Sequence, residues 1–511
     1  MKKLVFVLLL VMLVGVVSGA PELLFSSAKA GMNNGWPGDA TRGAAISLWG
    51  KGLGSSGTIT VAGQTLSSSN PNQVAEWGAT TNPTTSKGLQ RITFWLNNNM
   101  ALGPTTIRVN VAGENSNTLP FTIDNTGAIY VYPDDAGAQG WSDEEDTFKD
   151  MSPGDFLYFK TGIYDWEFYV GYDNNRNFDG TESNRITVTS YPGQEAQVTH
   201  SGSLDIEANY WTFSNLHFKG GYIVYGDDDG FCVGDSPQTH LESLGCSYDS
   251  TGMNHVMHSY SHYFKFLGNY IYCDTSQTAY DSNAYPVYIS SGDYQEIKWN
   301  EVHGGSDFVM HFYDEDRCSG AASQGRGMDN CVISNNIFDA TPIGTATRYN
   351  FRCGLVAEGK DGIADINNLS IYNNIFYSTN EPIGNSGAPG TSGIIRMAED
   401  MDDIYIYNNT FYNGYYGIHF NNEGPNDPDN FVIERNIFYD LDSDEVIWDY
   451  SGENVNLDYN VYEGIASLTN VNKGLNDLEN TDPQFTDPAN GDFTPLLGSP
   501  ACGYGAIPCA G

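Results

Sequence analysis

A unit of strand, asparagine and strand recurs through the second part of the chain. Clear copies are "NLSIYNNIFYS" (368–378), "DIYIYNNTFYN" (403–413) and "NFVIERNIFYD" (430–440). Apolar and polar positions alternate around each asparagine, which is typical of two short β-strands joined by a tight corner. The corner asparagines are Asn215, Asn269, Asn300, Asn336, Asn374, Asn409, Asn436 and Asn460, at intervals of 24 to 54 residues. We expect one coil per repeat, with these side chains hydrogen-bonded from coil to coil and the next residue pointing inward.

Each repeat also contains an earlier strand with regular alternation. Seven such segments align as "HVMHSY", "YPVYIS", "FVMHFY", "CGLVAE", "GIIRMA", "YGIHFN" and "EVIWDY", beginning at residues 255, 285, 308, 353, 393, 416 and 445. Successive side chains of a strand point to opposite faces, so the mostly apolar first, third and fifth positions predict a buried face. The fourth and sixth positions are then expected on the outer face of one sheet.

These outer positions carry side chains that suit a sugar polymer, and we expect them to face solvent along a groove. Aromatic rings stack on pyranoses, His and Tyr exchange protons, and Arg neutralises carboxylates. The predicted catalytic residues are His311, Tyr313, Tyr288, Arg396 and His258, and the predicted substrate contacts are Tyr260, Glu358, His419 and Trp448. The alternative interpretation is that these residues are ordinary polar and aromatic side chains of a solvent-facing strand.

Residues 21–124 have a different composition, rich in Gly, Ser, Thr and Asn. Alternating runs such as "GTITVAGQ" and "LQRITFWL" predict a small antiparallel β-sandwich. Two pieces, "ISLWGKGLGSSGTITVAG" and "TIRVNVAGENSNTLPFTI", resemble the IPT/TIG immunoglobulin-like module. The resemblance implies a spacer or a carbohydrate-contacting appendage.

Residues 125–511 resemble a right-handed parallel β-helix with an N-terminal cap and a C-terminal closing segment. The cap resemblance lies in "AIYVYPDDAG", in a helix expected around "SDEEDTFKDM" and in "SPGDFLYFKTGIY"; the closing segment is "DPQFTDPANGDFTPLLGSPACGYGA". The predicted fold class is therefore all-β, a solenoid preceded by an immunoglobulin-like β-sandwich.

The first 20 residues have the features of a secretory signal peptide: Lys2 and Lys3, an apolar run, and small residues before Pro21. Without those lysines, 21 basic residues stand against 63 acidic ones, a net charge of −42. Such a charge disfavours nucleic acid and anionic membranes as partners. No later segment is apolar enough to span a membrane. We expect an extracellular protein, secreted or held at the cell surface, in an oligomeric state that the sequence leaves open.

An even set of eight cysteines in an exported chain indicates disulfides. Short separations predict the pairs Cys232–Cys246, Cys318–Cys331 and Cys502–Cys509, which leaves Cys273 for Cys353.

A set of carboxylates follows two of the outer strands: Asp314, Glu315, Glu399 and Asp400. Oxygen ligands from adjacent coils could hold Ca²⁺. Solvated loop charge explains the same pattern.

The resemblance to β-helix proteins implies a polysaccharide lyase that acts on a uronate-containing polymer by β-elimination. The alginate and chondroitin lyase group, however, carries its base and acid in an "N-x-K-S"-like stretch, which is absent here. Lys265 and Lys298 lie instead on the strands before the corner asparagines.

Two other functions fit the sequence. A glycoside hydrolase would need two carboxylates, such as Glu358 with Asp314 or Glu399, but the Gly-His-Gly and paired-Asp signature of polygalacturonases is absent. A non-catalytic adhesion or envelope protein would need no catalytic geometry.

Overall fold

The computed structural model describes residues 20–80, 88–168, 170, 179–226, 239–251, 255–274, 285–304, 308–314, 327–341, 353–358, 366–379, 383, 393–398, 401–421, 430–442, 446–448, 455–463 and 473–509. Within these ranges, no helix is long and apolar enough to cross a membrane.

The N-terminal part folds as a β-sandwich, because alternating apolar side chains give each strand one buried face. One sheet contains β1 (Glu22–Ser26), β3 (Arg42–Lys51), β7 (Gln90–Asn97) and β6 (Val74–Thr80) in this order. The other contains β2 (Ala30–Gly31), β9 (Glu114–Ile123), β8 (Gly103–Val111), β4 (Thr58–Val61) and β5 (Gln64–Ser67). All pairs are antiparallel except β2 with β9. The predicted sandwich is thus present.

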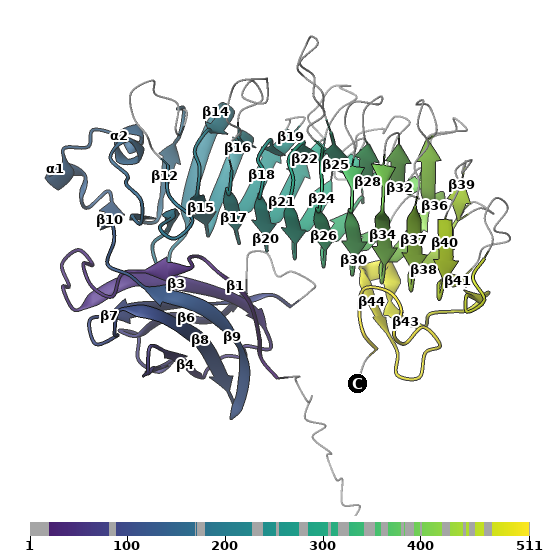
Figure 1. Ribbon diagram of the computed structural model, residues 1–511, viewed down its shortest axis with the longest axis horizontal. Coiled ribbons are helices and arrows are strands. Elements are labelled where there is room, and N and C mark those ends of the chain that lie inside the picture. The colour runs from purple at the N-terminus through teal and green to yellow at the C-terminus, as the bar shows by residue number, and fades with distance from the viewer. Residues whose placement is uncertain are drawn as a thin grey trace, which may run out of the picture.

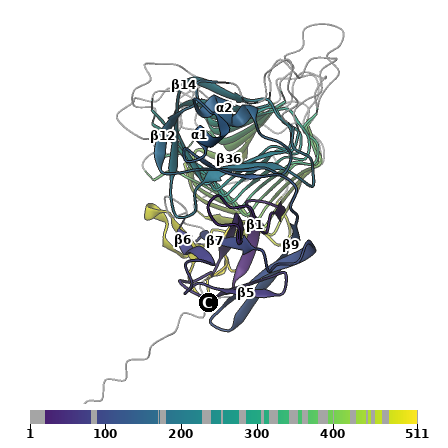
Figure 2. The same cartoon turned by 90° about the vertical axis from the view of Figure 1, so that its left-hand side faces the viewer.

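The following chain winds into a parallel β-helix (Figures 1 and 2). After its first strand come the helices α1 (Ala136–Gln139) and α2 (Glu144–Lys149), the second of which matches the helix expected in the cap. Twelve described strands stack in one sheet, called the docking sheet below: β10 (Ile129–Tyr132), β11 (Phe156–Phe159), β13 (Ile186–Ser190), β15 (Trp211–Ser214), β17 (Glu242–Leu244), β20 (Lys265–Leu267), β23 (Glu296–Lys298), β26 (Val332–Ser334), β30 (Ser370–Tyr372), β34 (Ile404–Tyr407), β37 (Phe431–Glu434) and β40 (Val455–Asp458).

A second sheet of nineteen described strands forms the rest of the solenoid wall. It opens with β12 (Gly162–Asp165), β14 (Ala196–Ile206) and β16 (Leu216–Tyr225), and β16 pairs with the first strands of two columns. The site column comprises β19 (His255–Ser259), β22 (Tyr285–Ser290), β25 (Phe308–Tyr313), β28 (Cys353–Glu358), β32 (Gly393–Ala398), β36 (Tyr416–Asn421) and β39 (Ile447–Trp448). The side column comprises β18 (Ser247–Thr251), β21 (Tyr270–Asp274), β24 (Glu301–Gly304), β27 (Ile337–Asp339), β31 (Ile375–Tyr377), β35 (Thr410–Gly414), β38 (Ile437–Leu441), β41 (Val461–Glu463) and β42 (Leu478–Glu479).

The solenoid pairings are parallel from coil to coil, and the inward side chains form one continuous core. A further parallel pair, β29 (Ile366–Asn367) with β33 (Met401–Asp402), lies at a corner. The parallel β-helix predicted from the repeats is therefore confirmed.

A buried asparagine ladder runs along the corner between the docking sheet and the side column. From Asn269 to Asn460, each side-chain oxygen accepts hydrogen bonds from the previous asparagine or, for Asn269, from the Cys246 N–H. Each side-chain nitrogen also donates to a backbone carbonyl, for example Asn374 to Ile333 at 2.8 Å. The last asparagine donates its backbone N–H to Asp477 at 2.7 Å. The ladder predicted from the sequence is confirmed, with an aspartate at its end.

Two details of the corner differ from the prediction. Asn215 is not in the ladder: it has a positive φ of 50° and occupies the position that glycine holds in the next coils, at Gly245 and Gly268. The residue after each asparagine also points outward, and the one after that points inward. The inward stack is formed by Phe338, Phe376, Phe411, Phe438 and Tyr462, with ring centroids 4.8–5.5 Å apart.

The sandwich is fixed to the docking sheet over the first half of the solenoid (Figure 1). The Tyr158 hydroxyl, on β11, donates to the Ala45 carbonyl and accepts from the Ala45 N–H, at 3.0 and 2.9 Å. Further along, Trp49 and the Phe25 ring stacked on it, with centroids 5.0 Å apart, pack into the corner beside Leu244 and Leu267. These contacts bury aromatic surface on both sides, so the sandwich has a defined orientation on the solenoid.

Replacing Gly245 with alanine is expected to weaken this contact. Gly245 has a φ of +60°, and an added Cβ would lie 2.5 Å from the Trp49 ring. The left-handed backbone alone costs about 1–2 kcal/mol for a non-glycine residue, and displacing the indole should cost about 1–3 kcal/mol more. Urea unfolding measures the sum. Gly193→Ala is the matched control, because Gly193 has a φ of +76° and open space around it; equal losses for both variants would contradict the docking role.

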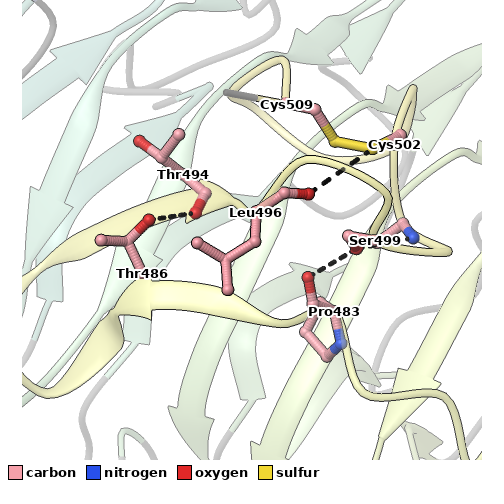
Figure 3. The surroundings of a disulfide bond; sticks show 8 residues. Pro483, Thr486, Thr494, Leu496, Ser499, Cys502 and Cys509 are labelled. Carbon is pink, nitrogen blue, oxygen red and sulfur yellow. Dashed lines mark hydrogen bonds between the residues drawn. A yellow bond between two sulfur atoms is a disulfide. The ribbon is translucent and has the colours of Figure 1, made fainter. Parts of the chain in front are cut away.

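The C-terminal segment folds back along the side column rather than across the end of the solenoid. It contains β43 (Phe485–Asp487), the 3-10 helix η2 (Pro488–Asn490) and β44 (Asp492–Pro495). Phe493 packs against the outward-facing Ile337 and Ile375. A disulfide joins Cys502 to Cys509, as the spacing predicts, near the hydrogen bond from Ser499 to the Pro483 carbonyl (Figure 3).

The other three predicted disulfides are wrong. Cys246 and Cys331 are buried thiols that contact backbone carbonyls of Phe213 and Gly292, and neither is part of a disulfide. Their expected partners, Cys232 and Cys318, lie outside the described residues. Cys273 and Cys353 are not joined to each other. The reason is that Cys246, Cys273 and Cys331 belong to the solenoid core, where they serve as small core residues.

Candidate functional site

The strands of the site column stack in the register that the sequence predicts. His258 pairs with Tyr288, Tyr288 with His311, His311 with Val356, and the row continues through Arg396 and His419 to Trp448. The alternate positions belong to the solenoid core: Met257, Val287, Ile289, Met310, Phe312, Leu355, Ala357, Ile395, Met397, Ile418 and Phe420. The row is therefore on the outer face of the site column, as its parity predicts.

The expectation that the whole row faces solvent is wrong. The exposed fractions are 8% for His258, 7% for Tyr288, 8% for His311, 4% for Tyr260 and 0% for His419. Parity fixes the face of a strand but not how deeply its neighbours cover that face. Here aromatic rings of the same and adjacent coils pack against His258, Tyr288 and His311 and contribute to their burial.

His311 lies in a cage of four rings. The centroids of Tyr285, Tyr288, Phe308 and Tyr313 are 5.0, 5.1, 5.3 and 5.0 Å from the imidazole centroid, and the Tyr313 ring is stacked on it. Tyr285, Phe308 and Tyr313 are partly exposed. The cage thus has a buried imidazole at its base and an accessible aromatic rim.

The rings continue toward the N-terminal coils around His258. Its imidazole lies 5.3 Å from Tyr222, 4.9 Å from Tyr288 and 6.2 Å from Tyr260. His258 therefore lies in an aromatic cluster. Because it is buried, it supports the accessible part of the row and is not one of the residues that a ligand could reach.

A charged group adjoins His311 on the other side. The Glu358 carboxylate has one oxygen, Oε2, 3.8 Å from His311 Nε2 and 3.9 Å from Arg396 Nη1. Burial alone would raise the pKa of Glu358, but hydrogen bonding with His311 and the charge of Arg396 outweigh it, so the pKa is lowered. The carboxylate is therefore ionised at neutral pH. Its side chain is 22% exposed and that of Arg396 is 17% exposed.

His419 packs in the next coil beside Arg396. Burial and the Arg396 charge lower the pKa of His419 to about 3. The imidazole is thus neutral in ordinary buffers, so it does not repel an anion bound to Arg396. Among the described residues, the buried Arg396 Nε has no hydrogen-bond partner.

The residues predicted to bind Ca²⁺ do not form a site in the described structure. Asp314 is 1% exposed and accepts a hydrogen bond from Ser291 at 2.9 Å. Glu315, Glu399 and Asp400 lie outside the described residues. The described residues contain no group of three or more His, Cys, Asp or Glu side chains arranged to hold a metal ion. Trp448 occupies its predicted strand position, and its side chain lies outside the described part.

One cluster of titratable residues in the structure was not predicted from the sequence. On the outer face of the side column, His303 Nε2 is 2.7 Å from Glu301 Oε1 and His303 Nδ1 is 3.0 Å from Asp339 Oδ2. Burial alone would lower the pKa of His303, but the two carboxylates raise it to about 9. Spacing within β24 places Glu301 and His303 on one face, whereas Asp339 comes from the next coil. The imidazole nitrogens are both occupied, so this cluster is a charge network rather than a reactive site.

No protein-family model and no curated protein matches the sequence. Solved structures similar to this chain include pectate lyase Pel9A, at 14% identity over 62% of this chain and 77% of that one, with a TM-score of 0.41. The PL6 family alginate lyase AlyGC is 15% identical over 71% of this chain and 55% of its own length, with a TM-score of 0.37. The A-module of Azotobacter vinelandii mannuronan C-5 epimerase AlgE4 is 9% identical over 64% and 91%, with a TM-score of 0.35. At these values the similarity gives no argument about the chemistry of this chain.

Proposed function

We propose that the outer face of the site column binds a uronate-containing polysaccharide and cleaves it by β-elimination. The observation that carries the proposal is the meeting of His311, its tyrosine neighbours, Glu358 and Arg396 in consecutive coils. The set combines proton-transfer groups, a cation and a rim of rings. These are the groups needed to remove a proton next to a carboxylate and to hold a sugar ring.

In this reaction His311, in its neutral form, takes the proton from the carbon next to the substrate carboxylate. The electron pair of that C–H bond forms a double bond to the neighbouring carbon, whose bond to the glycosidic oxygen breaks. Tyr288 or Tyr313 donates a proton to the departing oxygen. Arg396 neutralises the substrate carboxylate and stabilises the charge that develops on it. Mass and charge balance without an oxidant or a reductant.

The partly exposed rings of Tyr285, Phe308 and Tyr313 would contact pyranose faces. Tyr260 and His419 are buried, and in this proposal they support the site from below. We also propose that the protein is secreted, which its acidic composition suits, and that the N-terminal sandwich is an IPT/TIG module. Any role of Ca²⁺ would rest on carboxylates such as Glu315, outside the described residues.

A non-catalytic polysaccharide-binding protein is the second candidate. The burial of His258 and His311 favours it, because a base must reach its proton. A sandwich fixed to a rigid solenoid would suit adhesion.

The Arg396→Gln variant is expected to lose about a hundredfold in kcat/KM, the magnitude typical of losing one charge-stabilising donor. The measurement is the ultraviolet absorbance of the unsaturated uronate product, with a panel of uronate polymers and with Ca²⁺ or a chelator. Arg435→Gln is the matched control, since Arg435 is an arginine of the same solenoid that lies over the Tyr459 ring, beyond the end of the docking-sheet strand β37 and away from the site column. Binding without any product would favour the second candidate, and unchanged turnover in Arg396→Gln would remove Arg396 from the site.

A further inference from the structure

We infer that Glu358 is a positioning residue that holds His311 and Arg396 in their working arrangement and sets the protonation of His311. The role of this arrangement in catalysis rests on the function proposed above, while the coupling of Glu358 to His311 and Arg396 stands on the geometry alone.

The register explains why a carboxylate is needed at this position. His311 and Arg396 occupy the fourth position of coils that are two apart, with Val356 between them. Strands in a sheet are about 4.8 Å apart, so the strands that carry His311 and Arg396 are roughly 10 Å apart. At this separation the two side chains do not contact each other directly. Val356 is apolar and fully buried, and it cannot connect them.

Glu358 lies in the intermediate coil, at the sixth position of its strand, between Tyr313 and Ala398. Because Ala398 is small, the longer Glu358 side chain can turn back over Val356. The same oxygen then reaches both neighbours, with the distances to His311 Nε2 and Arg396 Nη1 differing by only 0.1 Å. One carboxylate thus couples the proton-transfer group to the cation.

The groups around His311 come from three strands. They are Tyr285 and Tyr288 on β22, Tyr313 and Phe308 on β25, and Glu358 on β28, with Arg396 beyond Glu358. Among these described neighbours, only Glu358 and Arg396 carry charge at neutral pH. A carboxylate within 4 Å favours the protonated imidazole, and the more distant guanidinium opposes it. Glu358 therefore raises the pH at which His311 becomes a neutral base.

The test is the Glu358→Gln variant, which keeps the shape of the side chain and removes its charge. Selective carbon-13 labelling of histidine allows an NMR pH titration of His311, whose signal is identified by its loss in His311→Gln. We expect His311 to bind its proton about tenfold more weakly in Glu358→Gln than in the parent. Glu434→Gln, on the docking sheet, should leave the His311 titration unchanged.

Kinetics provide the second readout. If a uronate polymer is cleaved, the rising limb of the pH profile of kcat/KM should move to lower pH by about one pH unit in Glu358→Gln. A merely structural role would lower the rate without moving the limb. An unchanged His311 titration would overturn the inference. A shifted titration in a protein that cleaves no polymer would keep the coupling and reject the lyase reaction, so the two failures are distinguishable.

Discussion

Replacing Asn374 with leucine is expected to lower the free energy of unfolding by about 4 kcal/mol. The side-chain oxygen of Asn374 accepts from the Asn336 N–H and amide group at 2.9 and 3.0 Å, and its amide donates to Ile333 and Asn409 at 2.8 and 3.0 Å. Asn374 is fully buried. Leucine would leave the buried Asn336 N–H without its partner and would remove one hydrogen bond each from the Asn336 amide, the Ile333 carbonyl and Asn409 Oδ1. An unsatisfied buried group costs about 1–3 kcal/mol and each further lost hydrogen bond about 1 kcal/mol. Equilibrium urea unfolding, followed by circular dichroism, measures the change.

The neighbouring Asn373→Gly variant is the control. Asn373 has a φ of 55° and is partly exposed, at the corner position that Gly245 and Gly268 occupy in earlier coils. Glycine adopts this conformation without strain, so we expect a change within about 0.5 kcal/mol. Comparable losses at positions 373 and 374 would mean that the ladder has no special energetic role.

The repeat pattern was sufficient to predict the coil, because its two main signals are local. Alternation within six-residue segments identified the inward face of the site column, and the recurring asparagine identified a corner. Asn215 shows the limit of the second signal. In its coil the asparagine occupies the left-handed position, which asparagine and glycine both accept, and the ladder position after it belongs to Leu216. An asparagine in the sequence therefore does not by itself show whether it occupies the left-handed corner position or the ladder position that follows it.

The cysteine pairing failed for a related reason. Cys246 follows Gly245 as Asn269 follows Gly268, so it occupies the ladder position of its coil and points inward. An alignment of the corners would have shown that Cys246 is a core position. The short separation between Cys232 and Cys246 in the sequence instead suggested a disulfide that closes a loop. Cys502 and Cys509 lie beyond the last coil, where no such constraint applies.

The sequence predicted which residues form the row of the candidate site, but not which side chains surround them. The order His258, Tyr288, His311 and Arg396 follows from parity and stacking. The cage around His311 depends instead on the reach of Tyr285 and Phe308, which lie at the first position of their strands, where an inward direction was predicted. Strand ends turn away from ideal alternation, and packing between coils decides the direction of such side chains.

His303 and its two carboxylates form the charged network that should respond most clearly to pH. The network is partly to fully buried, with side-chain exposures of 17% for His303, 10% for Glu301 and 14% for Asp339. The Tyr377 ring lies beside Asp339 and packs on Phe493 of the C-terminal segment. The network therefore links three coils to the closing segment. Removing the imidazole would leave two buried carboxylates without their cation.

The sign of the pH effect follows from the raised pKa of His303. The value rises from 6.5 to about 9 on folding, so the folded state binds the proton more tightly than the unfolded state. The stabilisation is complete below about pH 6.5 and disappears as the pH rises through about 9. A change of this size corresponds to about 3 kcal/mol.

We therefore expect His303→Gln to be less stable than the parent by about 3 kcal/mol below pH 6.5, and the difference to narrow as the pH rises through about 9. Urea unfolding of both proteins across this range measures it. His217→Gln is the matched control, because His217 contacts one carboxylate, Glu195, at 2.9 Å, and that partner is 53% exposed; an exposed pair of this kind contributes little. A constant difference between His303→Gln and the parent at all pH values would show that His303 acts through packing and not through its charge.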